Sequence, residues 1–191
     1  MALPKEIRMA AALANSPAAP PRRAEEPLHE IVRGVRVELP PMGAEAVDAA
    51  TELSAGLRPF AKQARLGRVV QEALFVIDRA QNTRRRPDVA FVSAERWPLE
   101  RPLPTGDWDV VPDLAVEVVS PNDALYAVLE KIDEYFAAGV REVWVLTPPR
   151  REATVYTLDR NPRVVTAAES LETPLLPGFA VKVGELFQPV G

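Results

Sequence analysis

The sequence predicts an α/β domain built around a mixed β-sheet, and three observations support this fold class. Short apolar segments typical of strands alternate along the chain with two segments of helical periodicity. Residues 114–119 form an apolar run of the kind found in a central strand that is covered on both faces. With 191 residues, of which 47% are hydrophobic, the chain is long enough to bury one substantial core.

The first 27 residues are rich in alanine and proline, and this composition predicts a disordered tail. Residues 28–191 are then expected to form the ordered domain. No signal peptide is expected, because the apolar stretch 9–13 is short and directly follows Arg8. The sequence also contains no run of about 18 apolar residues that could span a membrane. These features favour a cytoplasmic protein with no membrane partner.

The ordered part is expected to begin with a β-hairpin over residues 29–39, which turns at Arg33 and Gly34. Residues 44–65 then have helical periodicity, and Gly67 is expected to stop this helix. The helix face expected to be buried comprises Val47, Leu53, Leu57 and Phe60.

Two strands are expected next, over residues 68–78 and 88–92. A proline-rich loop follows, and it contains or adjoins Trp97 and Trp108. These two side chains could stack on nucleic-acid bases, although covering one edge of the sheet is the commoner use of such residues.

The apolar strand 114–119 leads through Ser120 into a second helix, which Gly139 terminates. The apolar stripe of this helix comprises Leu125, Val128, Leu129, Ile132, Tyr135 and Phe136. The remaining strands are expected over residues 142–146, 153–157 and 164–167.

Composition excludes several kinds of chemistry. The chain has no cysteine, so it can form neither a disulfide nor a thiolate metal site, and it has no cysteine nucleophile. Its single histidine, His29, excludes a metal cluster of several histidines. The net charge of −4 excludes a strongly basic protein that coats DNA, although it leaves a local basic patch open.

The most informative residue is Glu117, an acid in the middle of the apolar run 114–119. An unpaired carboxylate buried there would cost several kcal/mol, so a basic partner or a metal ion must stabilise it. Asp88 is a second acid at the start of a strand, and two carboxylates that converge with a main-chain carbonyl suit a hard cation such as Mg²⁺. Lys131 lies on the helix that follows Glu117 and could hold a water molecule or a developing negative charge.

Several ordered motifs together resemble the Uma-type restriction endonuclease family, bacterial proteins similar to the PD-(D/E)XK nuclease superfamily. The resemblance covers residues 28–188, and no single motif is specific by itself. The motifs are Glu30-Ile-Val-Arg-Gly34, Pro40-Pro-Met-Gly43, Arg86-Pro-Asp-Val-Ala-Phe-Val92, Pro112-Asp-Leu-Ala-Val-Glu-Val-Val-Ser-Pro121, Lys131 with Tyr135, Ala138-Gly-Val140, Glu142-Val-Trp144, Leu176-Pro-Gly-Phe179 and Glu185-Leu-Phe187.

The resemblance implies a restriction-endonuclease-like fold, in which a mixed β-sheet is flanked by helices, and a Mg²⁺-dependent site that hydrolyses phosphodiester bonds. By this resemblance Asp88 and Glu117 would ligate the metal, with the carbonyl of Val118 as a third ligand and Mn²⁺ as an alternative ion. Lys131 would take the role of the superfamily's lysine. That lysine ordinarily lies two residues after the second acid, where this chain has Val119.

Glu45 would match a helix acid that can complete the metal shell, and it is the fourth candidate catalytic residue. The family often carries a histidine directly after this acid, and this chain has Ala46 there. The missing histidine removes whatever contribution that side chain makes to activity.

Each candidate also has an ordinary structural explanation. Glu117 could be a buried acid paired with an arginine, and Asp88 a turn residue at the start of a strand. Lys131 could pair with glutamates on its own helix, and Glu45 could be a solvated acid that suits the helix dipole. The basic run 84–86 could grip a phosphate backbone or form a solvated loop.

The leading hypothesis is therefore a metal-dependent endonuclease whose partner is nucleic acid, with DNA as the expected substrate. A nuclease that cuts both strands commonly needs two sites, so a homodimer is the expected assembly. The alternative is a nucleic-acid-binding or assembly domain that keeps the fold without efficient catalysis, which Ala46 and the net charge favour. A small-molecule binding module ranks last. A basic rim around the site would support nucleic acid, whereas an acidic rim would contradict a nuclease.

Overall fold

The computed structural model describes residues 27–119, 124–159 and 161–187. The helices are α2 (Ala44–Gln63) and α3 (Leu125–Ala138), with short 3-10 helices η1 (Pro148–Arg150) and η2 (Val183–Phe187). The strands are β1 (His29–Val32), β2 (Val35–Glu38), β3 (Gly67–Gln71), β4 (Phe75–Asp78), β5 (Thr83–Arg85), β6 (Val89–Ser93), β7 (Leu114–Val118), β8 (Glu142–Thr147), β9 (Glu152–Thr157), β10 (Arg163–Val165), β11 (Ser170–Glu172) and β12 (Ala180–Lys182). The predicted mixed α/β architecture is confirmed.

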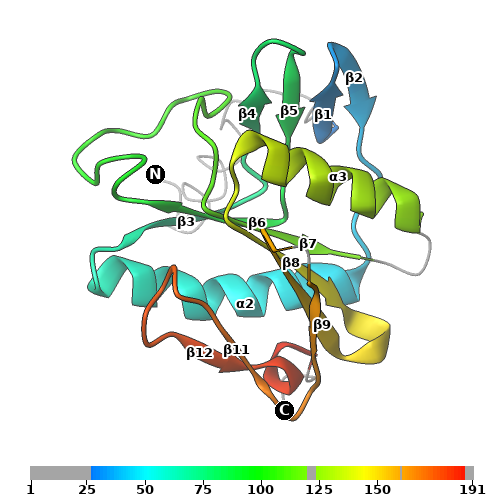
Figure 1. Ribbon diagram of the computed structural model, residues 1–191, viewed down its shortest axis with the longest axis vertical. Coiled ribbons are helices and arrows are strands. Elements are labelled where there is room, and N and C mark those ends of the chain that lie inside the picture. Colours follow the sequence, from blue (N-terminus) through cyan, green and yellow to red (C-terminus); the bar gives the residue numbers. More distant parts are fainter. Residues whose placement is uncertain (1–26, 120–123, 160, 188–191) are drawn as a thin grey trace, which may run out of the picture.

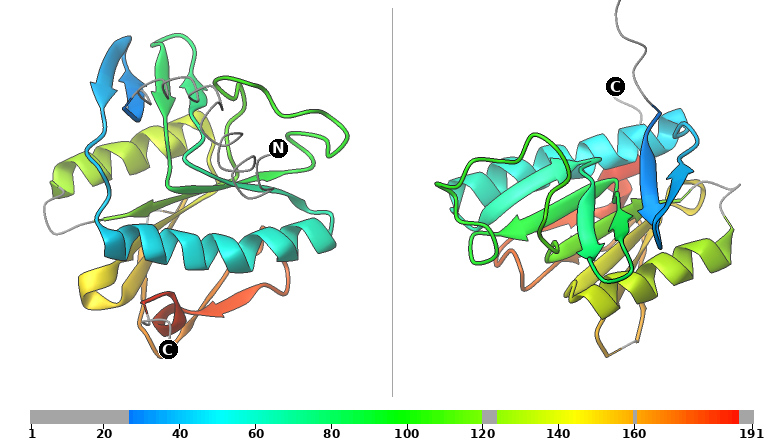
Figure 2. Two further views of the ribbon diagram at one scale, coloured as in Figure 1. Left: turned by 180° about the vertical axis from the view of Figure 1, so that it is seen from behind. Right: turned by 90° about the horizontal axis from the view of Figure 1, so that it is seen from above.

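The central sheet has the strand order β10-β9-β8-β7-β6-β3, and only β7 and β8 pair in parallel within it. Helix α2 packs against one face and α3 against the other (Figure 1). A second sheet, β2-β1-β5-β4, lies on the α3 side, and β11 pairs with β12 near the C-terminal end of the described chain (Figure 2). The predicted hairpin is the β1–β2 pair, with its turn at Arg33 and Gly34, both of which have positive φ.

The alternation of side chains along β7 divides the core in two. Leu114, Val116 and Val118 point to the α2 side, where they join one buried cluster. Ala115 points to the α3 side and joins the other cluster. Glu117 has the same parity as Ala115, so the strand directs its carboxylate toward α3. The buried acid therefore meets the residues of the helix that follows it in the sequence.

The structure corrects the prediction of a single strand over residues 68–78. Glu72 has a φ of 51°, and the chain leaves the central sheet there. Residues 67–71 form β3, which pairs with β6, whereas residues 75–78 form β4, which pairs with β5 in the second sheet. A run of apolar residues does not reveal that it is shared between two sheets.

The first helix also differs from the prediction in two details. Val47 is 48% exposed, and the buried face consists mainly of small residues. The buried residues of α2 are Ala46, Ala49, Ala50, Leu53, Ser54, Leu57 and Ala61. The helix ends at Gln63, before Gly67, and Gly67 is instead the first residue of β3.

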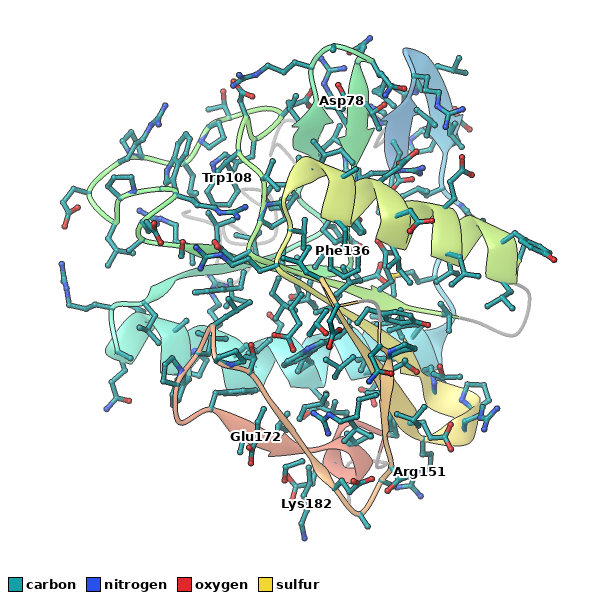
Figure 3. The ribbon with its side chains drawn as sticks, in the orientation of Figure 1. Asp78, Trp108, Phe136, Arg151, Glu172 and Lys182 are labelled. Atoms are coloured by element: carbon teal, nitrogen blue, oxygen red, sulfur yellow. The ribbon has the colours of Figure 1, made fainter. Side chains whose placement is uncertain are left out.

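The tryptophans next to and within the proline-rich loop belong to the core. Trp97 and Trp108 are 6% and 3% exposed, and the Trp108 ring stacks on Phe75 with centroids 5.4 Å apart. Figure 3 shows Trp108 beneath this loop, and Phe136 between α3 and the central sheet. Neither tryptophan is available to stack on bases, so the edge-covering explanation is the correct one.

Some predictions fall outside the described residues. These are residues 1–26 of the disordered tail predicted over residues 1–27, the cap of the second helix at Ser120 and its start at residues 121–122. The described part of that helix begins at Leu125, and Gly139 terminates it with a φ of 98°, as predicted. None of the described helices combines the length and apolar character needed to cross a bilayer.

At Gly67 the backbone of β3 lies so close to β6 that there is no room for a Cβ atom. A Cβ atom there would lie 2.2 Å from the Val92 carbonyl oxygen and 2.7 Å from the Phe91 ring. We expect Gly67→Ala to lower the free energy of unfolding by about 1–3 kcal/mol, because β3 must move away from β6. Urea unfolding followed by circular dichroism measures this change. Gly106→Ala is the matched control, since no atom lies within 4 Å of its added Cβ; equal stability of the two variants would contradict the packing argument.

Candidate active site

Strand pairing places Asp88 and Glu117 opposite each other. The register of β6 and β7 pairs Val89 with Val116, and extending it by one residue sets Asp88 against Glu117. Asp88 lies just before β6 and completes the ladder with its side chain, because its Oδ2 accepts a 2.6 Å hydrogen bond from the Val118 N–H. This bond holds the Asp88 carboxylate against the backbone of Val118.

Glu117 is held from the other side by two residues of α3. The Tyr135 hydroxyl donates to Glu117 Oε1 at 2.6 Å, and the Lys131 ammonium lies 3.2 Å from Oε2. Lys131 and Tyr135 are four residues apart, so one face of the helix presents both groups to the carboxylate. The basic partner of Glu117 is therefore Lys131 and not the arginine of the structural alternative.

Lys131 also contacts a carboxylate from the hairpin. Its Nζ lies 3.1 Å from Glu30 Oε1, in addition to its contact with Glu117. The acids on its own helix pair elsewhere, Glu130 with Arg33 and Glu134 with Arg85, so the surface-lysine explanation is wrong. The ammonium is shared between two buried acids that belong to different sheets.

Glu30 is a charged residue next to the site, in contact with Lys131, and it is not among the candidate site residues predicted from the sequence. Its side chain is 2% exposed, and it also accepts hydrogen bonds from Arg85 at 2.7 Å and from the Arg86 N–H at 3.0 Å. Burial acts to raise the pKa of Glu30, but Lys131, the Arg86 N–H and Arg85 together lower it. The available signal was the alternation of side chains along β1, which places Glu30 on the face that is directed toward α3.

The basic run 84–86 is not a solvated loop, because all three arginines contact other groups of the protein. Its contact with a phosphate backbone stays a prediction. Arg85 is 6% exposed and holds Glu30 and Glu134. Arg84 forms an ion pair with Asp107, and Arg86 donates to the carbonyls of His29 and Glu72. The three arginines thus stabilise the second sheet through ion pairs and hydrogen bonds. Arg86 is also one of the residues that line the cavity described next.

The site opens into a cavity of about 180 Å³. Its ionisable lining residues are Arg86, Asp88, Glu117 and Lys131. The rest of the lining comes from the segment 39–43 between β2 and α2, from Ala46, from Val118 and Val119 at the end of β7, and from the start of α3. Glu45 is exposed and does not line the cavity, although Gly43 and Ala46 on either side of it do. The structure thus brings together Asp88, Glu117, Val118 and Lys131 and leaves Glu45 outside.

Burial and crowding perturb the protonation of these groups. Burial and the nearby Glu117 raise the pKa of Asp88 to about 7. Burial also raises the pKa of Glu117, against the opposing effects of Lys131 and Tyr135. Burial would lower the pKa of Lys131, but Glu117 and Glu30 raise it above its ordinary value, so the ammonium stays charged. Two crowded acids beside one fixed cation form an arrangement that a further cation would stabilise.

The donor set suits a small, hard cation. Among the described residues, Asp88 Oδ1 accepts no hydrogen bond, while Oδ2 is held by Val118. No group of three or more histidine or acidic side chains in the described chain is placed to hold a metal, so protein ligation would rest on two carboxylates and a main-chain carbonyl. Mg²⁺ is commonly bound in this way, through one or two carboxylates together with water and substrate phosphate.

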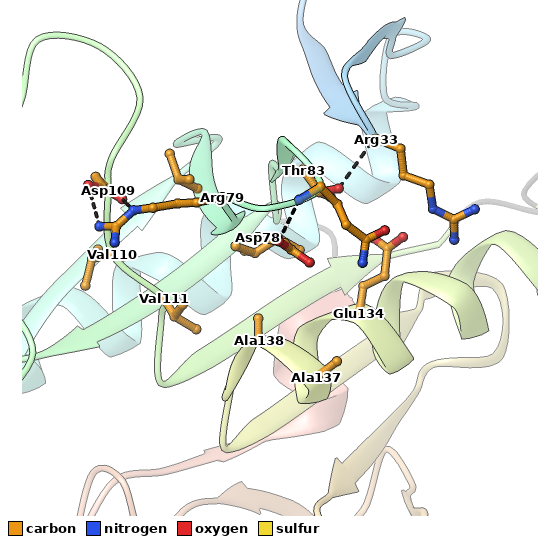
Figure 4. A pocket seen from close by; sticks show the side chains of 13 residues that line it. Arg33, Asp78, Arg79, Thr83, Asp109, Val110, Val111, Glu134, Ala137 and Ala138 are labelled. Carbon is orange, nitrogen blue, oxygen red and sulfur yellow. Dashed lines mark hydrogen bonds and ion pairs between the residues drawn. The ribbon is translucent and has the colours of Figure 1, made fainter.

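A larger cavity, of about 520 Å³, lies elsewhere, between the second sheet and the C-terminal half of α3 (Figure 4). Its charged groups already have partners. Arg79 makes two hydrogen bonds to Asp109, Glu134 is paired with Arg85, and Asp78 caps the N–H of Gln81. The smaller cavity, with its perturbed acids, is therefore the better candidate for an active site.

Comparison with known proteins identifies the family and the fold of the chain. The sequence profile of the Uma2 family, described as "Putative restriction endonuclease", matches residues 17–184. The chain belongs to the Uma2 family. The match covers nearly the same part of the chain as the resemblance seen in the motifs, and it begins earlier, at residue 17. No similar sequence is found among curated proteins.

A solved structure shares the fold of this Uma2 chain. It is the crystal structure of a protein from Anabaena variabilis described as "a putative nuclease belonging to DUF820". The two are 18% identical with a TM-score of 0.73, and the alignment covers 92% of this chain and 94% of the other. At this identity the likeness concerns the fold, and it confirms the predicted restriction-endonuclease-like architecture.

The raised pKa of Asp88 has a consequence for stability. From its ordinary value of 3.8 up to about pH 7, the folded protein retains a proton on Asp88 that the unfolded chain has lost. Stability should therefore fall as the pH rises through this window. We expect Asp88→Asn, which cannot ionise but still accepts from Val118, to remove much of this fall. Urea midpoints measured from acid to neutral pH test this expectation. Asp48→Asn, at an exposed position on α2, serves as the control, and identical profiles for Asp88→Asn and wild type would refute the assignment.

Proposed function

We propose that this protein is a Mg²⁺-dependent endonuclease that hydrolyses phosphodiester bonds of DNA in the cytoplasm, with Mn²⁺ as an alternative ion. The proposal rests chiefly on one observation. Asp88 and Glu117 face each other across β6 and β7 within a single cavity, and Lys131 lies on Glu117. Membership of the Uma2 family supports the same reaction class.

Each residue of the site would have a different role in the proposed reaction. Asp88, Glu117 and the Val118 carbonyl would hold the ion. When bound, it would lower the pKa of a water molecule and offset charge on the phosphate. Tyr135 fixes the orientation of Glu117 through its 2.6 Å hydrogen bond. Lys131, which stays protonated, would donate to a phosphate oxygen and offset the negative charge that develops in the transition state. Glu45 is outside this set because it does not line the cavity.

The charges around the cavity bear on how nucleic acid would bind. A groove of about 670 Å³ adjoins the cavity, and Glu38, Glu72 and Arg86 are among its lining residues. The rim is therefore mixed, neither the basic surface that favours nucleic acid nor the acidic surface that opposes it. With so few cationic contacts, phosphate binding would depend strongly on the ion.

One observation favours the alternative of a domain that has lost efficient catalysis. Ala46, which stands where the family often has a histidine, is among the residues that line the cavity. A histidine there would contribute a polar group beside Asp88 and Glu117 that this chain lacks. This alternative keeps the nucleic-acid partner, so it differs from the proposal in turnover rather than in binding.

Metal binding and cleavage test the proposal together. We expect calorimetry to detect Mg²⁺ or Mn²⁺ binding to the wild type, and plasmid nicking to depend on the same ion. Glu117→Gln should abolish the binding heat and slow nicking by about a hundredfold or more, because it removes a carboxylate ligand. Glu52→Gln, an exposed acid on α2, is the matched control and should behave as wild type.

The outcomes separate the two functions. Metal binding together with DNA binding, but without nicking, would support the inactive domain. Absence of metal binding would overturn the mechanism and leave Glu117 as a structural ion-pair residue. Thermal melts of Glu117→Gln show whether the variant is folded when these comparisons are made.

Proton release gives a second test of the ligand set. Because the pKa of Asp88 is about 7, the side chain is roughly half protonated at neutral pH, and an ion must displace the proton to bind there. We expect Mg²⁺ affinity to increase as the pH rises through neutrality. The apparent heat should also differ between two buffers of different ionisation enthalpy. Asp88→Asn should lose both effects. Heats that agree in the two buffers would show that Asp88 is not a ligand.

A further inference from the structure

The cavity that contains Asp88 and Glu117 continues into the groove beside it. The residues that line both are Leu39, Pro40, Pro41, Met42, Arg86 and Asp88. The residues that line the groove alone are Pro27, Leu28, Glu38 and Glu72. A ligand in the groove would therefore lie directly beside the candidate metal ligands.

Arg86 is a fixed cation where the cavity and the groove meet. Its Nε donates to the His29 carbonyl at 3.1 Å, and its Nη1 donates to the Glu72 carbonyl. The other two arginines of the run 84–86 form ion pairs, whereas Arg86 forms none with the described residues, whose acids attract it only over a longer distance. Its Nη2 donates to no group in the described part of the chain. The guanidinium is thus oriented by neutral carbonyls and can still donate to an anion such as a phosphate oxygen.

The rest of the groove suits a nucleobase better than a phosphate backbone. Leu28, which is 40% exposed, forms an apolar wall together with the segment 39–42. The two acids that line the groove alone, Glu38 and Glu72, carry the same sign of charge as phosphate. Carboxylates repel phosphate, but they accept hydrogen bonds from the amino groups of bases.

We propose that the groove binds one unpaired nucleotide next to the scissile phosphate, so that the substrate is single-stranded or locally unpaired DNA. Arg86 would contact the phosphate of this nucleotide, and the base would lie on the apolar wall. In a duplex each base is stacked between its neighbours and presents only its edges, so it cannot cover an apolar wall. An unpaired base presents its face. This inference rests on the proposed function, because it names the substrate class of the same site.

Binding of labelled oligonucleotides, followed by fluorescence anisotropy, tests the inference separately from turnover. Ca²⁺ replaces Mg²⁺ as the hard cation, and gel electrophoresis shows whether the strands stay intact. We expect the full chain to bind a single strand about tenfold or more tightly than the duplex of the same sequence. An abasic strand keeps the phosphates without the bases and should bind about fivefold or more weakly than the normal strand. Plasmid nicking is still expected, because negative supercoiling favours local unpairing.

Leu28→Ser tests the contact with the base. We expect this variant to lose most of the difference in affinity between the normal and the abasic strand, while its affinity for the abasic strand stays that of wild type. Leu103→Ser is the matched control, because Leu103 is 45% exposed and lines neither the cavity nor the groove. Thermal melts show whether both variants are folded.

Arg86→Gln tests the contact with the phosphate. It removes the charge but keeps a side-chain donor for one of the two carbonyls. We expect the dissociation constants of the normal and the abasic strand to rise together, by about tenfold, because the lost contact does not involve the base. Arg84→Gln removes a charge from the same basic run, and it should bind both strands like wild type, since Arg84 is paired with Asp107 and lines neither hollow.

The results distinguish failure of this inference from failure of the proposed function. Duplex bound as tightly as the single strand would overturn the inference. A Leu28→Ser variant that keeps the full difference between normal and abasic strands would also overturn it, and would leave the groove to another occupant, such as the N-terminal residues of the chain or a protein partner. A preference for single strands without metal-dependent nicking would overturn only the activity. Equal nicking of relaxed and supercoiled plasmid would keep the activity and reject the unpaired substrate.

Discussion

The contact of one ammonium group with two buried carboxylates organises this protein. Lys131 lies 3.2 Å from Glu117 and 3.1 Å from Glu30, and it joins α3, the central sheet and the hairpin in one charged cluster. A carboxylate in the interior of β7 without a cation would cost several kcal/mol. The position of α3 across the sheet is therefore constrained by charge as well as by apolar packing. Arg85 extends the cluster by bridging Glu30 and Glu134.

The same cluster separates acids that stabilise the fold from acids that are suited to chemistry. Burial acts to raise the pKa of Glu30, but its contacts with Lys131, the Arg86 N–H and Arg85 together lower it, so these groups already compensate its charge. Within the described part of the chain, only the Val118 N–H donates to Asp88, and burial beside Glu117 raises the pKa of Asp88 to about 7. Burial also raises the pKa of Glu117, and Lys131 and Tyr135 oppose this effect. An incompletely satisfied acid that lines a cavity is the feature expected of a ligand or catalytic group.

Local sequence patterns could predict the elements of this fold but not the contacts between distant ones. An unbroken apolar run with one acid was sufficient to place β7 and to single out Glu117, because a buried charge requires a partner. The break at Glu72 was not predictable, since the strand-like run continues through it while the chain changes sheets. The pairing of Glu30 with Arg85 joins residues far apart in the sequence, and no periodicity signals it. Tyr135 appeared as one apolar residue of a helix stripe, although its spacing from Lys131 was the clue to its polar role.

The geometry also couples the hairpin edge to the cavity. Strand β2 ends at Glu38, and the next residues, 39–43, form part of the cavity wall before α2 begins. Leu39 is tied back to Leu28 by a main-chain hydrogen bond, and Pro40 and Pro41 restrict the backbone that follows. This connection has little freedom to absorb a displacement of β2. The segment 39–43 therefore connects the edge strand directly to the cavity wall. The hairpin thus bears on the site in two ways, through the charge of Glu30 on Lys131 and through the segment that it leads into.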